Sequence, residues 1–155
     1  MLFKSLSILA LFALPLVSAD YFDDSTGEFY PNDVPELVVT TIGCPATCEI
    51  KTRANDVLSM NYVGRLFGSR KKFDSSYDRH QAFNFTLGVG QVINGWDEGL
   101  AGMCIGEQRN LIIPSRLAYG PDGLPAAMIP AHTALIFDVQ LMGFTTTTPA
   151  PKSEL

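Results

Sequence analysis

The feature that most constrains the fold of this chain is a period-two alternation of apolar and polar residues. In Asp56–Leu66, the apolar residues Leu58, Met60 and Tyr62 alternate with polar neighbours, and residues 83–87 repeat the pattern. Successive side chains of a strand point to opposite faces, so the pattern predicts antiparallel strands with one polar face. Further strands are predicted at Gln108–Ile113, at Ala134–Met142 and, as an edge strand, at Leu37–Thr41.

One segment has the spacing of a short amphipathic helix. Trp96, Leu100 and Met103 recur at the i, i+4, i+7 interval that forms one helical face. Asn94 is the predicted cap, the acidic residues that follow suit the helix dipole, and Gly102 or Gly106 is expected to end the helix. The prediction is therefore an α+β domain: an antiparallel, roughly five- to six-stranded twisted sheet wrapped around one short amphipathic helix.

The first 19 residues have the features of a cleaved secretory signal peptide. Lys4 provides a positive n-region, Leu6–Val17 is an apolar run, and small residues allow cleavage after Ala19. The run is shorter than the about 20 apolar residues of a transmembrane helix, and Pro15 interrupts it. We therefore expect residues 1–19 to be removed and no segment to span a membrane.

Negative charge is concentrated at the start of the mature chain. The net charge is −5, and it becomes −6 without Lys4. Acidic residues without any base crowd residues 20–36, whereas acids and bases balance between residues 48 and 144. A neutral domain argues against nucleic-acid binding, which requires a basic surface. We expect residues 20–47 to be an acidic lead-in and edge strand, with the acidic part a solvated, mobile tail.

Three cysteines, Cys44, Cys48 and Cys104, would meet an oxidising compartment behind a signal peptide. An odd number leaves one thiol free or intermolecular. Three residues separate Cys44 from Cys48, so the pair is not a redox C-x-x-C motif, although a bridge between them remains an alternative. His80 and His132 lack the spacing of zinc ligands, and we expect no metal and no cofactor.

Aromatic residues are spread over residues 73–137, and two of them adjoin carboxylates. They are Phe73, Phe83, Phe85, Trp96, Tyr119 and Phe137. Asp74 and Asp138 are the adjoining carboxylates, and no Ser/His/Asp set, cysteine nucleophile or metal cluster accompanies them. This combination predicts a site that works by shape and desolvation, not by covalent chemistry.

Four motifs follow one another between residues 71 and 142. They are KKFDSSYDR (Lys71–Arg79), FTLGVGQVINGWDEGLAGM (Phe85–Met103), GEQRNLIIPSRLAYG (Gly106–Gly120) and LIFDVQLM (Leu135–Met142). Their order and spacing resemble the FKBP-type (macrolide-immunophilin) peptidyl-prolyl isomerases. The resemblance covers Ala54–Phe144, and we place the isomerase domain at residues 48–144. The signal peptide, the cysteines and the C-terminal tetrapeptide resemble the small secretory-pathway members of that family.

The resemblance implies an enzyme that accelerates cis–trans isomerisation of the bond preceding proline. Amide resonance gives this rotation a barrier of roughly 18–20 kcal/mol, and uncatalysed it takes on the order of tens to hundreds of seconds. A twisted amide has lost its resonance, and its oxygen carries less charge. A dry aromatic pocket then favours the twisted amide, which is differential binding of the transition state. The alternative is a non-catalytic binding module or chaperone that uses the same pocket.

The resemblance also assigns the apolar part of the pocket. Trp96 is expected to form the floor beneath the prolyl ring, and the backbone N–H of Ile93 to bond a ligand carbonyl. Ile129 is expected to close the loop side. The walls are assigned to Tyr62, Phe83, Val92, Ile93 and Phe137.

The polar part follows from the same resemblance. Phe73 and Asp74 are expected where the amide carbonyl sits, Arg79 to pair with Asp74 and orient it, and Tyr119 to donate its hydroxyl to the ligand. The residues expected to act in catalysis are Tyr62, Phe73, Asp74, Tyr119 and Phe137. Phe85 is assigned to packing, and Asp138 to local hydrogen bonds.

A disulfide between Cys48 and Cys104 is implied by the relatives, with Cys44 left over. Residues 145–155 are expected to form a flexible tail whose last four residues, Lys152–Leu155, resemble the K-D-E-L retention signal. This places the protein in the lumen of the endoplasmic reticulum, with secretion as the alternative. Asn84 begins a glycosylation sequon, Asn84-Phe85-Thr86.

The expected partners are proline-containing polypeptides, the macrolides tacrolimus and rapamycin, and a retention receptor, with the protein itself a monomer. The sequence departs from the smallest family members in the loop Pro121–Ile129. That loop is one residue longer and carries Leu124 and the run Ala126–Met128. The departure bears on substrate preference and on drug-dependent partners, not on isomerisation.

Overall fold

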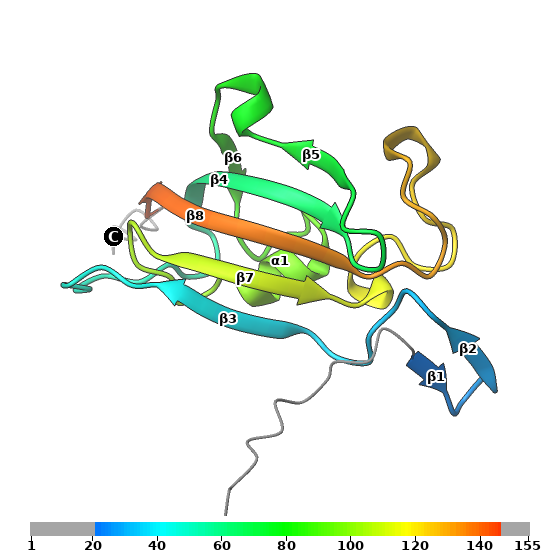
Figure 1. Ribbon diagram of the computed structural model, residues 1–155. Coiled ribbons are helices and arrows are strands. Elements are labelled where there is room, and N and C mark those ends of the chain that lie inside the picture. The colour runs from blue at the N-terminus through cyan, green and yellow to red at the C-terminus, as the bar shows by residue number, and fades with distance from the viewer. Residues whose placement is uncertain (1–20, 147–155) are drawn as a thin grey trace, which may run out of the picture.

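The computed structural model describes residues 21–146, which form a twisted antiparallel sheet, a small hairpin and a short helix (Figure 1). The expected signal peptide and the retention-like tetrapeptide lie outside the described residues. The main sheet has six strands in the order β3-β7-β8-β4-β5, with β6 also paired to β4. Their bounds are β3 Val38–Gly43, β4 Val57–Leu66, β5 Lys72–Ser75, β6 Phe83–Thr86, β7 Gln108–Ile113 and β8 Leu135–Thr145. The predicted fold class is confirmed.

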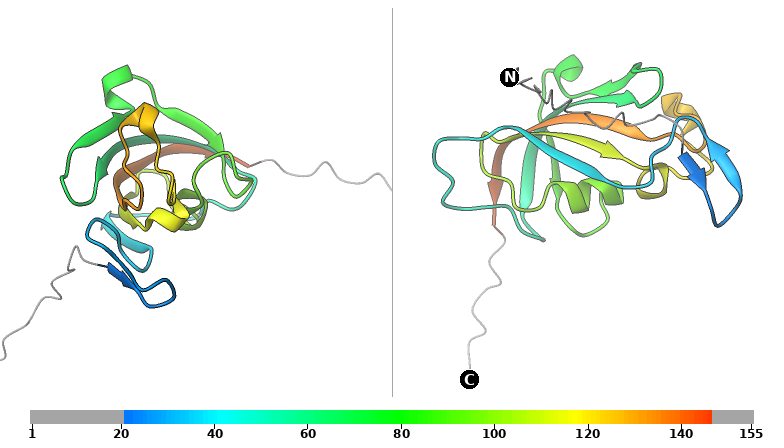
Figure 2. Two further views of the ribbon diagram at one scale, coloured as in Figure 1. Left: turned by 90° about the vertical axis from the view of Figure 1, so that its right-hand side faces the viewer. Right: turned by 60° about the horizontal axis from the view of Figure 1, so that its bottom comes forward.

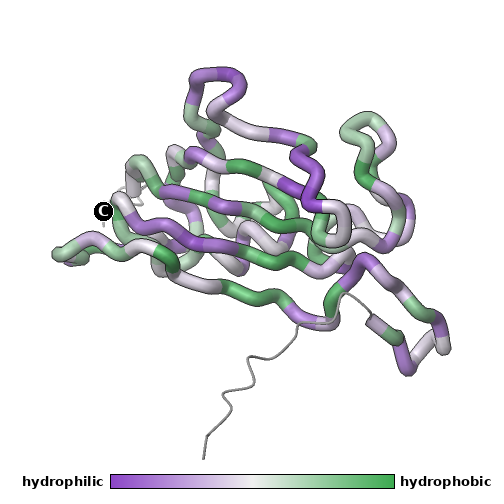
Figure 3. The backbone as a smooth tube through the Cα atoms, viewed as in Figure 1, coloured by the Kyte–Doolittle hydropathy of each residue, from purple (hydrophilic) through white to green (hydrophobic). Residues whose placement is uncertain are grey.

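Strands β4 and β8 form the centre of the sheet. They pair antiparallel from Val57 opposite Thr145 to Leu66 opposite Leu135. Every second residue of β4 is buried, as the alternation predicts, and Figure 3 shows hydrophilic and hydrophobic bands alternating along these strands. Strand β3 lies at the edge of the sheet, as predicted. Between residues 21 and 146, no helix has the length and apolar character needed to cross a membrane.

Helix α1 (Asn94–Gly99) lies under one face of the sheet (Figure 2). Two glycines let its backbone approach β7 closely. A Cβ atom on Gly95 would stand 2.3 Å from Ile113 Cγ2, and one on Gly99 would stand 3.1 Å from Leu111 Cδ2. This approach buries Trp96, on the same helix, with only 4% of its surface exposed.

The ends of α1 differ from the sequence prediction. Asn94 is the first helical residue, and the N-cap is Ile93, which provides no side-chain cap. The helix ends at Gly99, before either glycine that was expected to terminate it. Arg109 instead bonds the chain at this end: its Nη1 donates to the carbonyl oxygen of Gly99, the last helical residue (2.8 Å), and to that of Ala101, just beyond the helix (2.9 Å). A cation at this end also suits the helix dipole.

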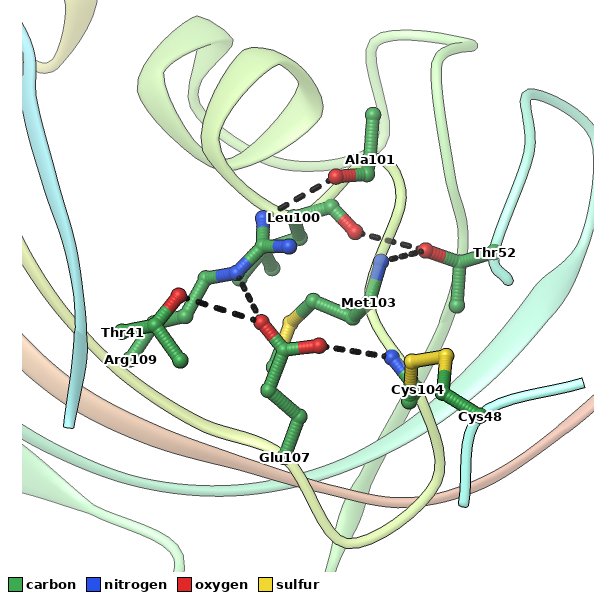
Figure 4. The surroundings of a disulfide bond; sticks show 9 residues. All are labelled: Thr41, Cys48, Thr52, Leu100, Ala101, Met103, Cys104, Glu107 and Arg109. Atoms are coloured by element: carbon green, nitrogen blue, oxygen red, sulfur yellow. Dashed lines mark hydrogen bonds and ion pairs between the residues drawn. A yellow bond between two sulfur atoms is a disulfide. The ribbon is translucent and has the colours of Figure 1, made fainter. Parts of the chain in front are cut away.

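A disulfide joins Cys48, which precedes β4, to Cys104, which follows α1, with their Cα atoms 5.6 Å apart (Figure 4). The pairing implied by the relatives is confirmed, and the alternative bridge between Cys44 and Cys48 is wrong. Cys44 is a free, exposed thiol. Because Cys48 is paired elsewhere, a redox site built from Cys44 and Cys48 has no support.

Buried polar groups surround the disulfide and hold the end of α1 (Figure 4). Glu107 accepts a hydrogen bond from the backbone N–H of Cys104 (2.8 Å) and another from Arg109 Nε (2.7 Å). Thr52 Oγ1, close to Cys48 in the chain, donates to the carbonyl oxygen of Leu100 (2.8 Å). The helix is therefore tied to the segment before β4 by covalent and hydrogen bonds together.

The acidic lead-in is structured, so the prediction of a solvated, mobile tail is wrong. β1 (Tyr21–Asp23) and β2 (Glu28–Tyr30) pair as a hairpin beside the main sheet. Asp33 is only 5% exposed, and its carboxylate accepts hydrogen bonds from Ser115. Composition misses this because a carboxylate can be buried when donors far along the chain satisfy it.

The disulfide yields the first testable expectation. Replacing Cys48 and Cys104 together by alanine should lower the free energy of unfolding by about 2–5 kcal/mol, since the bridge restricts the unfolded chain. Urea denaturation with the Cys44→Ala variant as matched control measures this effect. An equal loss in the Cys44→Ala variant would contradict the assignment.

The glycines of α1 yield a second expectation, in which replacing a helical glycine by alanine lowers the stability of the protein. Alanine is favoured over glycine within a helix by about 1 kcal/mol. Gly95→Ala should nevertheless destabilise the protein, by about 1–3 kcal/mol, because its methyl group overpacks against Ile113. The control is Gly143→Ala, where a Cβ atom meets nothing within 4 Å. Thermal and urea unfolding of both variants decide the matter; a more stable Gly95→Ala protein contradicts the close approach.

Candidate functional site

A cavity of about 380 Å³ opens between α1, the β4–β5–β6 side of the sheet and the loop after β7. Ten side chains that the sequence assigned to a pocket line it. They are Tyr62, Phe73, Asp74, Arg79, Phe83, Val92, Ile93, Trp96, Tyr119 and Phe137. The structure thus brings together residues that eight different segments supply.

Regular elements deliver most of these side chains. β4 presents Tyr62, β5 presents Phe73 and Asp74, and η1 (Tyr77–Arg79) presents Arg79. β6, α1 and β8 contribute one aromatic ring each. The remaining three residues come from two loops, one leading into α1 and one following the 3₁₀ turn η2 (Ser115–Leu117).

Aromatic rings meeting edge to face form the base of the cavity. The ring centroid of Trp96 lies 5.2 Å from that of Tyr62 and 5.2 Å from that of Phe137, with interplanar angles of 84° and 82°. Phe73 meets Phe137 at 5.6 Å and 89°. Such pairs add about 0.5–1.5 kcal/mol beyond the apolar area they bury. The rings therefore fix one another's orientation before any ligand arrives.

Gly64 makes room for two of these rings, a role that sequence reasoning missed. A Cβ atom at Gly64 would stand 2.8 Å from Phe137 Cε1 and 2.8 Å from Phe73 Cζ. The available signal was a glycine inside an otherwise alternating strand, which often marks a close approach of another group.

A closed polar network stands on one side of the cavity. Tyr62 Oη donates to Asp74 Oδ2 (2.5 Å), and Arg79 donates through Nη1 to Asp74 Oδ1 (2.5 Å) and through Nη2 to Tyr62 Oη (2.7 Å). The Arg79–Asp74 ion pair expected from sequence is present in the structure. The hydroxyl of Tyr62, assigned from sequence to an apolar wall, joins it as a third member.

This network sets the protonation of its members. Burial alone would raise the pKa of the Asp74 carboxyl, but hydrogen bonds from Tyr62 and Arg79 outweigh burial and lower it. Burial, followed by the hydrogen bond to Asp74, raises the pKa of Tyr62 to about 12. Burial, followed by the negative charge of Asp74, raises the pKa of Tyr119. At neutral pH the site therefore holds one carboxylate, one guanidinium and two neutral phenols.

Other hydrogen-bond donors of the cavity remain available to a ligand. Among the described residues, neither the hydroxyl of Tyr119 nor the backbone N–H of Ile93 has an acceptor. The buried indole Nε1 of Trp96 likewise has no partner within residues 21–146. Buried donors without partners are rare.

Ile129 does not line the cavity. It is 2% exposed and belongs to the main core. It pairs with Leu124 through two backbone hydrogen bonds of 2.9 and 3.1 Å, which close the loop Pro121–Ile129 around η3 (Pro125–Ala127). The side chain exposed at the end of this loop is Met128 (64%), whose φ of 56° is left-handed. Ile129 therefore anchors the loop from inside.

Three other residues singled out from sequence lie away from the cavity lining. Phe85 is buried and stacks on Phe83, 5.6 Å between ring centroids, as packing predicts. Asp138 forms an ion pair with Arg65 (2.5 Å) and accepts a hydrogen bond from a neighbouring amide, as expected for local hydrogen bonding. Asn84 is exposed on β6.

Comparison with known proteins places this geometry in a family. A family model described as FKBP-type peptidyl-prolyl cis-trans isomerase matches residues 48–142. FK506-binding protein 2 of Dictyostelium discoideum is 52% identical over 99 residues, covering 64% of this chain and 73% of that protein. FK506-binding protein 2B of Rhizopus delemar is 53% identical over 95 residues, covering 61% of this chain but only 45% of that protein. The crystal structure of AtFKBP13 superposes with a TM-score of 0.64 at 31% identity, covering 74% of this chain and 97% of that one.

The polar network yields an expectation for pH dependence. Tyr62→Phe removes a hydrogen bond to the Asp74 carboxylate, so the pKa of Asp74 should rise. Carboxyl NMR titration measures the change. The control is Tyr77→Phe, which removes a hydroxyl from a half-exposed tyrosine outside this cavity. Matching Asp74 titration curves in the wild type and Tyr62→Phe would refute the role of the hydroxyl.

The sign of the linked stability change follows from the lowered pKa of Asp74. The folded state binds the proton more weakly than the unfolded chain. The stabilisation is therefore fully present above the unfolded value, near 3.8, and is lost as pH falls through the folded value. The stability difference between wild type and Asp74→Asn should stay constant from pH 7 to about 5 and shrink below about 4.

Proposed function

The chain belongs to the FKBP-type peptidyl-prolyl cis-trans isomerases, and from this premise we propose that it accelerates proline-limited folding of proteins in the secretory pathway. The observation that carries this proposal is the lining of the cavity, which is mostly aromatic with few polar groups. Aromatic rings form its base, its only charged lining residues are the paired Asp74 and Arg79, and the hydroxyl of Tyr119 has no acceptor among the described residues. A flat, neutral prolyl ring with a polar amide on one side matches that distribution.

The mechanism we propose is non-covalent stabilisation of a twisted amide. The prolyl ring rests on Trp96, and the edge-to-face rings around it exclude water. Tyr119 and the N–H of Ile93 hold the flanking carbonyls by hydrogen bonds. The pocket then fixes the substrate without solvating the rotating bond, so the planar ground state loses more by desolvation than the twisted state.

Asp74 contributes to the same discrimination by its charge. A planar amide carries more negative charge on its oxygen than a twisted one. If that oxygen lies beside Phe73 and Asp74, the carboxylate repels the planar state more strongly. The network with Arg79 and Tyr62 keeps Asp74 ionised at neutral pH, which supports this role.

The location proposed is the lumen of the endoplasmic reticulum. The disulfide between Cys48 and Cys104 supports an oxidising compartment. The apolar N-terminal run and the tetrapeptide Lys152–Leu155 support entry and retention, although both lie outside the described residues. Asn84 is exposed, as a glycan acceptor must be, and we include it as a glycosylation site. The protein would act as a monomer on proline-containing polypeptides, and tacrolimus or rapamycin would occupy the same cavity.

The test is proline-limited peptide isomerisation by the protein lacking residues 1–19, with and without rapamycin. Wild type should accelerate the reaction, rapamycin should abolish the acceleration, and Trp96→Leu should reduce it. Tyr119→Phe should lower kcat/KM by about 2- to 10-fold, the loss of one hydrogen bond. The matched control is Tyr77→Phe, which should retain full activity.

Circular dichroism and urea denaturation verify that each variant is folded, because Trp96 also belongs to the core. Rapamycin binding followed by tryptophan fluorescence without any rate acceleration would replace catalysis with the alternative, a non-catalytic binding module. Equal activity in Tyr119→Phe and Tyr77→Phe would remove Tyr119 from the proposed mechanism.

A further inference from the structure

The segment Tyr30–Val34, called here the N-terminal strap, precedes residues 48–142, which match the family model. It lies against the chain that carries Tyr119 into the cavity, residues Ser115–Ala134, called here the Tyr119 loop. Figure 2 shows the hairpin that leads into the strap beside this loop. The strap is thus an addition to the matched domain that contacts the loop supplying Tyr119 to the pocket.

Asp33 joins the strap to the start of the Tyr119 loop. Its Oδ1 accepts a hydrogen bond from the backbone N–H of Ser115 (2.8 Å), and its Oδ2 accepts one from Ser115 Oγ (2.5 Å). Its Oδ1 also accepts from the N–H of Val34 (2.9 Å). Asp33 and Ser115 are both 5% exposed. Loss of the carboxylate would leave two buried donors of Ser115 unsatisfied.

The strap also holds the far end of the same loop. The carbonyl oxygen of Asn32 accepts from the N–H of Ala134 (2.8 Å). The ring of Tyr30 stacks on His132, with centroids 4.2 Å apart and planes at 15°. Val34 packs into a second small core with Ala134. The strap therefore contacts both ends of the Tyr119 loop.

Hydrogen bonds inside the Tyr119 loop connect the residues that the strap contacts to the two neighbours of Tyr119. The carbonyl oxygen of Ser115 accepts from the N–H of Ala118 (2.9 Å) and from the N–H of Gly120 (2.8 Å). The carbonyl oxygen of Gly120 accepts from the N–H of His132 (3.0 Å). Both neighbours of Tyr119 are thus bonded to residues that the strap contacts directly.

We propose that Asp33 is a positioning residue for Tyr119, so that the N-terminal strap completes the substrate pocket of the matched domain. Asp33 touches no ligand; it fixes Ser115, Ser115 fixes the backbone on both sides of Tyr119, and the phenol is held facing the cavity. The expected loss of activity rests on the proposed function. The expected change in the position of Tyr119 rests on the contacts above alone.

A double-mutant cycle distinguishes positioning from general stabilisation. Asp33→Ala should lower kcat/KM about 2- to 10-fold, the scale of one hydrogen bond from Tyr119. In a Tyr119→Phe background the same substitution should change kcat/KM by less than about 2-fold, since the hydroxyl it positions is gone. Asp33→Asn keeps an acceptor for the N–H of Ser115 and should restore part of the activity. Asp24→Ala, an exposed acid of the hairpin, is the matched control.

A structural readout keeps the proposal testable apart from catalysis. Asp33→Ala should shift the ring NMR signals of Tyr119 and speed amide exchange at Gly120, whereas Asp24→Ala should do neither. If Asp33→Ala does not fold, Ser115→Ala replaces it, because that variant retains the backbone donor. If the wild type accelerates nothing, the proposed function fails, and the NMR and exchange data still decide whether the strap holds Tyr119.

Two results would overturn the inference. One is an equal fold-loss of kcat/KM on Asp33→Ala in the wild-type and Tyr119→Phe backgrounds, which would make Asp33 a stabiliser unrelated to Tyr119. The other is a Tyr119 ring signal and a Gly120 exchange rate that are the same in Asp33→Ala as in Asp24→Ala.

Discussion

The closeness of α1 to β7 is the constraint on which the rest of the structure depends. Gly95 leaves no space for even a methyl group against Ile113. This contact sets the height of the helix above the sheet, and Trp96 is carried on the same turn. If the helix stood farther away, the indole would lose its edge-to-face contacts with Tyr62 and Phe137. The disulfide and Arg109 then hold the other end of the helix, so the helix that carries the base of the cavity is anchored at both ends.

The polar groups of the cavity fall into two sets, one paired within the protein and one without partners among the described residues. The sheet supplies Tyr62 and Asp74, whose hydrogen bonds are satisfied internally by Arg79. Because those groups are paired, a ligand does not need to compete with water for them. Tyr119 stands on a loop with its hydroxyl unpaired among the described residues. A pocket of this kind offers a preorganised apolar base with few donors to orient a ligand, which is the usual design of small-molecule sites.

Sequence reasoning succeeds where the signal is local or repeated. The alternation in β4 gives the sheet, and the family motifs place ten residues around one cavity. It fails where the cause lies far along the chain. The hydroxyl of Tyr62 joins the ion pair only because β4 and β5 are paired, and Asp33 is buried only because Ser115 lies opposite it. Ile129 shows a related limit: it lies in the core and outside the cavity lining, because loop geometry decides whether an apolar residue beside a pocket points into the pocket or into the core.

The acidic lead-in shows why composition alone misleads: its carboxylates differ in burial and in the donors that they contact. Most of its carboxylates are exposed, as a solvated tail requires, but Asp33 alone contacts two buried donors. These two hydrogen bonds offset part of the entropy lost on ordering the segment, and the Tyr30–His132 stack and the Asn32–Ala134 hydrogen bond add to them. Because Ser115 begins the turn that precedes Tyr119, its hydrogen bonds to Asp33 connect the lead-in to a residue of the cavity. A segment outside the matched domain thereby becomes part of the pocket's geometry, and comparing isolated domains would miss its contribution.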